Sequence, residues 1–137
     1  MMTLLLLHSW WRWMVLTALL VSIARSARGM WAAAGFTPFD NTLRHWTATI
    51  AHIQLVLGMT LFVKNPVADR FRLIHITGMI IAVTVVTIGS AMAKRKTSHR
   101  EKFMTMLRWF VAALVIILLF IPWPWSPLAQ RPLFRTF

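Results

Sequence analysis

Three histidines stand inside long apolar stretches of this 137-residue chain, where a titratable side chain is costly. His8 lies in "LHSWWRWMVL", His52 opens "HIQLVLG", and His75 lies in "LIHITGM". Ionisable residues in such stretches are rare; they bind ligands, carry protons or ions, or hydrogen-bond to neighbouring helices. We therefore take these three histidines as the first candidates for chemistry.

Four apolar segments must position these histidines, at about residues 4–24, 45–63, 73–93 and 103–121. Each is long enough to cross a hydrocarbon core of ~30 Å as a helix of about 20 residues. The chain is 58% hydrophobic and 13% charged, with a mean hydropathy of +0.66, whereas soluble domains carry about 25% charged residues. The sequence predicts an all-α integral membrane four-helix bundle, with residues 1–137 forming a single transmembrane domain.

The lysines and arginines predict the orientation of this bundle. Eight of them fall in the loops 25–44 and 94–102, and five fall on the opposite face. Because cytoplasmic loops carry the excess of basic residues, both termini are expected on the non-cytoplasmic side of a bacterial inner (cytoplasmic) membrane. The first segment lacks a basic n-region, so we expect a retained anchor and not a cleaved signal peptide. Basic clusters between apolar runs do not indicate nucleic-acid binding.

Local signals predict where the helices begin and end. Glycines and a proline argue against one continuous helix across the loop 25–44, and Asp40 or Asn41 is the expected N-cap of the second helix. Pro122 should end the fourth helix near Ile121, because proline clashes with the preceding turn. Trp- and Pro-rich residues 122–137 are then expected as an interfacial tail that is held in place, as a larger assembly would do.

Several chemistries are disfavoured by residue type and position. The chain has no cysteine, which excludes thiolate ligands and cysteine nucleophiles. Its three carboxylates, Asp40, Asp69 and Glu101, all fall in predicted loops, so no paired-carboxylate site is expected. A zinc hydrolase would need a third ligand at a matching depth, and none is apparent. We therefore expect an electron carrier or a subunit of a complex more than a stand-alone enzyme.

The depth of each histidine in the membrane predicts which of them meet. At ~1.5 Å of rise per residue, His8 lies about 6 Å and His75 about 5 Å inside the outer ends of their helices. His52 lies about 16 Å from the same side, near mid-membrane. His8 and His75 are thus the natural axial pair for a metal. His52 would serve a second site or hydrogen-bond the first, and a pair of His52 with His75 stays an alternative. His45 and His99 are expected at the interface and in solvent.

Three further residues could complete a site for a flat macrocycle with acidic side groups. Arg12 follows His8 at i+4 on the same face, where it could pair with a carboxylate or instead extend past the tryptophans towards the interface. Gly78 and Ala82 follow His75 at i+3 and i+7 and leave room on that face. The same small residues are equally typical of close helix packing.

The segments "LHSWWRW", "HIQLVLG", "LIHITGM" and "IPWPW" together resemble a family of small four-helix bacterial membrane proteins labelled cytochrome b-like. The resemblance covers roughly residues 5–125. His8, Arg12, His52 and His75 occupy the polar positions of that family, whereas His45, His99 and the tail after Trp125 lie outside its pattern. The resemblance implies a haem b cofactor.

Two hypotheses follow for the function of the chain. The first is a bis-histidine b-type cytochrome in which His8 and His75 hold the iron, Arg12 balances a propionate, and single electrons pass near the outer face. A membrane quinone is a possible partner for it. The second is a cofactor-free accessory subunit of a respiratory or photosynthetic complex, or a subunit that binds a pigment through one histidine. Both hypotheses place the chain in a larger membrane protein complex.

Overall fold

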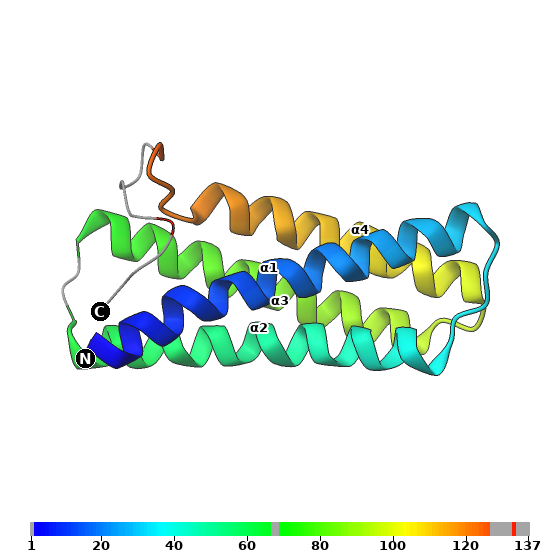
Figure 1. Ribbon diagram of the computed structural model, residues 1–137, viewed down its shortest axis with the longest axis horizontal. Coiled ribbons are helices and arrows are strands. Elements are labelled where there is room, and N and C mark those ends of the chain that lie inside the picture. Colours follow the sequence, from blue (N-terminus) through cyan, green and yellow to red (C-terminus); the bar gives the residue numbers. More distant parts are fainter. Residues whose placement is uncertain (1, 67–68, 127–132, 134–137) are drawn as a thin grey trace.

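Four antiparallel helices form the whole of the described fold (Figure 1). The computed structural model describes residues 2–66, 69–126 and 133. The helices are α1 (Met2–Trp31), α2 (Pro38–Lys64), α3 (Arg70–Arg95) and α4 (His99–Phe120). The start of α1, the end of α2, the start of α3 and the end of α4 lie together at one end, which we call the N-terminal end of the bundle. The α1–α2 and α3–α4 loops form the opposite, loop end. The predicted helical bundle is confirmed.

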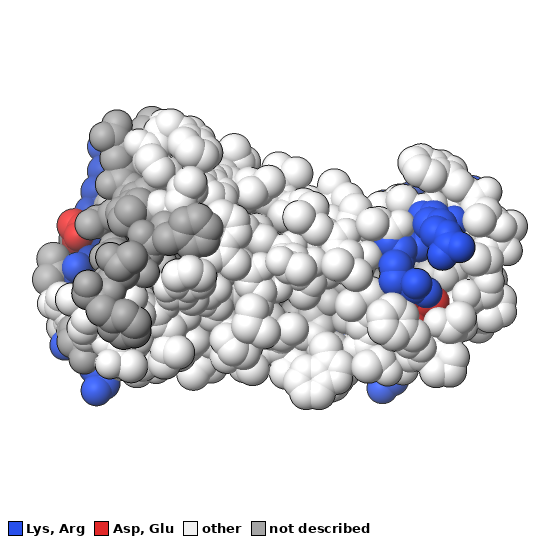
Figure 2. All heavy atoms as spheres, viewed as in Figure 1, with Lys and Arg blue, Asp and Glu red and all other residues white. Residues whose placement is uncertain are grey.

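All four helices are long and apolar enough to cross a membrane. Large apolar side chains such as Leu20, Val56 and Leu119 are more than half exposed on the outside of the bundle. On the face drawn in Figure 2, lysines and arginines gather at the two ends and leave an uncharged band between them. The chain is a multi-pass membrane protein whose apolar outer surface contacts the lipid bilayer.

The first helix continues well beyond its predicted end at residue 24. It runs to Trp31, through Gly29, so that the expected loop of about 20 residues is only residues 32–37. Gly29 is buried against the ring of Phe103 from α4, and a Cβ atom there would collide with that ring. The glycine that suggested a break in the helix is thus needed for close packing between α1 and α4.

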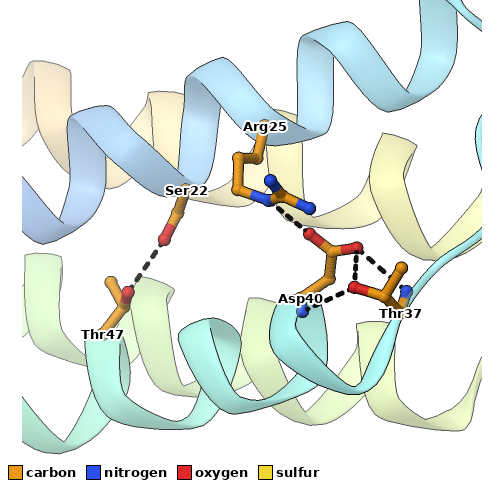
Figure 3. A network of polar contacts seen from close by, with 5 residues as sticks. All are labelled: Ser22, Arg25, Thr37, Asp40 and Thr47. Carbon is orange, nitrogen blue, oxygen red and sulfur yellow. Dashed lines mark hydrogen bonds and ion pairs between the residues drawn. The ribbon is translucent and has the colours of Figure 1, made fainter.

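The N-cap of α2 is Thr37, and the prediction of Asp40 or Asn41 was wrong. Thr37 accepts a hydrogen bond from the backbone of Asp40, while the Asp40 carboxylate accepts from the backbone and the hydroxyl of Thr37 (2.9 and 2.8 Å). This is a capping box with Pro38 at the first helical position. Arg25 of α1 joins it through an ion pair with Asp40 at 2.6 Å (Figure 3).

Small residues bring α3 and α4 into close contact. Gly89 packs against Trp109, and Gly78 packs against the ring of Phe120. Ala82 is fully buried in the core. Phe120 occupies the space beside Gly78, so the helix-packing interpretation of these small residues is confirmed.

Polar contacts join α2 to both of its neighbours towards the loop end. The hydroxyls of Ser22 and Thr47 lie 2.8 Å apart across α1 and α2 (Figure 3). The buried guanidinium of Arg44 donates to the backbone carbonyl and the hydroxyl of Ser90 in α3 (3.2 and 2.6 Å) and to the side chain of Asn41. Since buried polar groups of a membrane protein must be satisfied internally, these bonds fix the register of α2 in the bundle.

Candidate functional site

A cavity of about 370 Å³ lies inside the bundle near its N-terminal end, with lining residues from all four helices. Its volume falls in the range of small-ligand and cofactor sites, roughly 300–1,000 Å³. Most of its wall is apolar. The polar side chains in it include His8, Arg12, Gln54, Arg72 and His75.

The two histidines predicted to form a pair meet in this cavity. His8 comes from α1 and His75 from α3, and the centroids of their rings lie 6.3 Å apart with an angle of 82° between the ring planes. Both helices bring their histidine to the same depth, as the count of residues from the helix ends predicted. The structure therefore brings the two imidazoles close together in the wall of one cavity.

The orientation of His75 is fixed by the end of α4. Its Nδ1 lies 2.8 Å from the backbone carbonyl of Phe120, and because a carbonyl only accepts, Nδ1–H is the donor. The carbonyl of Phe120 is in the last turn of α4, where carbonyls lack a partner within the helix. Phe71 stacks on the imidazole at 5.6 Å. In the neutral ring Nε2 then carries the lone pair, which is the arrangement found in metal-ligating histidines.

The position of His8 depends on two residues of α2 that sequence reasoning missed. Gln54 donates to the backbone carbonyl of His8 at 2.9 Å. A Cβ atom at Gly58 would lie 3.0 Å from Cε1 of His8, so the glycine makes room for the imidazole. The only signal in the sequence is the i+4 spacing of Gln54 and Gly58, which places both on one face of α2.

Arg12 lines the same cavity and also reaches the C-terminal tail. Its Nη2 donates to the backbone carbonyl of Leu133, and its guanidinium lies 5.2 Å from the ring centroid of Trp13 and 5.8 Å from that of Trp123. The described part of the tail thus contacts the bundle. Residues 127–132 and 134–137 of the predicted tail lie outside the described part of the chain.

The structure does not bring His52 into the cavity with His8 and His75. Its imidazole is exposed on the outside of the bundle between α2 and α3, where Nε2 lies 2.7 Å from the hydroxyl of Thr87. His45 is exposed beside Trp46, two turns into α2.

His99 is also exposed, but it has a specific partner. Its Nδ1 accepts a hydrogen bond of 2.8 Å from the backbone N–H of Phe36, which joins the first residue of α4 to the α1–α2 loop.

The His8–His75 pair fits a ligated iron better than a bare metal ion. Within residues 2–66, 69–126 and 133, no group of three or more His, Cys, Asp or Glu side chains could hold a metal ion. Two metal–nitrogen bonds of about 2 Å each place the centres of two axial imidazoles roughly 6 Å apart, and the observed separation is 6.3 Å. The spacing of the two ring centres is thus one that two imidazole ligands of a single iron would have.

Comparison with known proteins adds no relative: no protein family, curated protein or solved structure matches the chain. The resemblance to small cytochrome b-like membrane proteins stays a prediction.

Proposed function

We propose that this protein is a b-type cytochrome of the membrane, in which His8 and His75 would hold the iron of one haem. The observation that carries the proposal is that two imidazoles whose ring centres lie 6.3 Å apart both line one cavity of about 370 Å³. A haem held there would supply one-electron oxidation and reduction of its iron. With two strong nitrogen ligands, the site favours electron transfer over the activation of oxygen.

The residues around the pair have separate tasks in this proposal. The backbone carbonyl of Phe120 holds the proton of His75 on Nδ1 and so keeps Nε2 available as a ligand. Gly58 leaves room for the ring of His8. Arg12 and Arg72 both line the cavity. Guanidinium groups so placed would bind carboxylate side groups of the cofactor.

The surroundings of the cavity suggest where electrons enter and leave. The cavity lies at the N-terminal end of the bundle, which the distribution of lysine and arginine predicts to be the non-cytoplasmic side. We propose that the protein works there as a small subunit of a larger complex in a bacterial inner membrane, with a membrane quinol as electron donor. Exposed tryptophans such as Trp10 and Trp125 suit an interface with lipid or with a partner subunit.

The haem content of histidine variants tests the proposal. We expect purified wild-type protein to contain one haem per chain by the pyridine haemochrome assay. His75→Ala and His8→Ala should each lose most of it, because each removes one of two axial ligands. His45→Ala is the matched control and should keep the full content, since His45 is exposed and far along α2 from the cavity.

Full haem content in both His75→Ala and His8→Ala would contradict the assignment of the ligands. Protein that folds with no haem at all would favour the other hypothesis, a cofactor-free accessory subunit of a membrane complex.

A further inference from the structure

Arg108 is a charged residue on the outer face of α4, inside the fourth apolar segment. Its side chain is exposed. In the part of the chain that the structure describes, no hydrogen bond, ion pair or ring contact joins its guanidinium to another residue. Since a guanidinium keeps its charge even in apolar surroundings, and a charge facing hydrocarbon is costly, this position calls for an anion from outside the chain.

Contacts between the helices place Arg108 at the edge of the hydrocarbon. Gly89 of α3 packs against Trp109, and the next residue of α3 accepts hydrogen bonds from Arg44 of α2. Trp46, which is 53% exposed, lies two residues after Arg44. Arg108 and two tryptophans of different helices therefore share one level of the bundle. Because tryptophan is enriched at the boundary between hydrocarbon and headgroups, that level marks the boundary on the side of the loop end.

The side chain of Arg108 extends from this level towards the headgroups. In an α-helix the Cα–Cβ bonds tilt towards the N-terminus, and the N-terminus of α4 lies at the loop end. Glu101 of the first turn of α4 lies on the same face but about 10 Å nearer the loop end. Within the described residues no ion pair joins these two side chains. The cation of Arg108 is thus available to a headgroup.

Beyond Arg108, the exposed face of α4 is entirely apolar towards the N-terminal end. The large side chains exposed on it are Val111, Val115, Leu118 and Leu119. We call these four residues the α4 stripe. From Arg108 to Leu119 the helix rises about 16 Å, which is about half of a hydrocarbon core of ~30 Å, the depth of one leaflet. A charge followed by one leaflet's depth of apolar surface matches the build of a phospholipid.

We propose that Arg108 binds the phosphate of an anionic phospholipid of the leaflet at the loop end, whose acyl chains lie along the α4 stripe. A guanidinium presents a fork of N–H donors that fits phosphate oxygens. A headgroup with a net negative charge is favoured over a zwitterionic one, because phosphatidylcholine carries its own cation beside the phosphate. The stripe has no polar side chain with which the helix of another subunit could form a hydrogen bond.

The test is the binding of single lipids to the purified protein in dodecyl maltoside, counted by native mass spectrometry during titration with phosphatidylglycerol or phosphatidylcholine. We expect the first phosphatidylglycerol to bind about fivefold more tightly than the first phosphatidylcholine, the value of one arginine at a membrane surface. Arg108→Gln should abolish this preference. Arg108→Lys keeps the charge without the fork and should restore part of it.

Arg100→Gln is the matched control, because it removes the same charge from an exposed position on the same helix, two turns nearer the loop end. It should bind phosphatidylglycerol as the wild type does. Circular dichroism of each variant checks that the helical content is unchanged.

Three results would overturn the inference. Equal binding of the two lipids by the wild type would show that no anionic site exists. An equal loss in Arg100→Gln and Arg108→Gln would reduce the preference to the overall charge of the loop end. Unchanged phosphatidylglycerol binding in Arg108→Gln would leave the guanidinium to another anion, such as a carboxylate of a partner subunit.

Discussion

Replacing Arg25 with Gln is expected to destabilise the bundle more than replacing its partner Asp40 with Asn. The two side chains join α1 to the start of α2 through an ion pair at 2.6 Å. The carboxylate of Asp40 is 2% exposed, whereas the side chain of Arg25 is 35% exposed. Arg25→Gln therefore leaves a buried carboxylate without its cation, while Asp40→Asn leaves a cation that can turn towards water.

The burial of the pair limits the size of the effect. Exposed ion pairs contribute about 0.2–1 kcal/mol, and removing one partner of a buried pair costs about 3–5 kcal/mol. With one partner buried and the other partly exposed, the coupling between Arg25 and Asp40 should be about 2 kcal/mol. The two hydrogen bonds from Thr37 to the Asp40 carboxylate remain in Arg25→Gln. The loss of unfolding free energy in this variant should therefore be smaller than that caused by a buried carboxylate with no partner.

A double-mutant cycle measures this coupling directly. The free energy of unfolding would be followed by circular dichroism in mixed micelles with increasing dodecyl sulfate, for the wild type, Arg25→Gln, Asp40→Asn and the double variant. Thr37→Val is a useful companion, because it removes the capping box and leaves the ion pair in place. A coupling below about 0.5 kcal/mol would refute the reasoning, since it would place the pair among ordinary surface contacts.

Three further changes test the packing and the site. Gly89→Val should destabilise the protein by about 1–3 kcal/mol in the same unfolding assay, because the added side chain meets Trp109; unchanged stability would contradict the close approach of α3 and α4. Gly58→Ala should crowd the ring of His8 and lower the affinity for haem severalfold while the helical content stays constant. If Gly58→Ala bound haem as tightly as the wild type, the His8 ring would not need the space that the glycine leaves. Arg12→Gln should lower the reduction potential on the order of tens of millivolts in a redox titration, because a nearby positive charge favours the reduced form; an unchanged potential would place the guanidinium too far from the cofactor to act on it.

The broad architecture of this protein was predictable because the apolar segments are long and the charges fall between them. The depths of His8 and His75, counted from the ends of their helices, also predicted that these two rings meet. The count works because antiparallel helices that cross the same membrane share its two surfaces as a common reference. His52 was expected near mid-membrane by the same count, but its exposed position could not be deduced from depth alone.

The errors arose where contacts between helices decide the outcome. Gly29 looked like a helix break, because its packing against Phe103 is not visible in the sequence. For Gly78 the sequence allowed both open space and close packing, because it does not show that Phe120 lies against it. The helix cap was placed three or four residues too late because Thr37 and Asp40 act together, and a capping box is recognised only as a pair.

The most direct test of the proposed cytochrome is a reduced-minus-oxidised absorbance spectrum of the purified protein. The proposal predicts the sharp α band of a b-type haem, with no shift on addition of carbon monoxide because His8 and His75 would both bind the iron and leave it no open position. A flat difference spectrum from folded protein would contradict it and would assign the cavity to some other ligand.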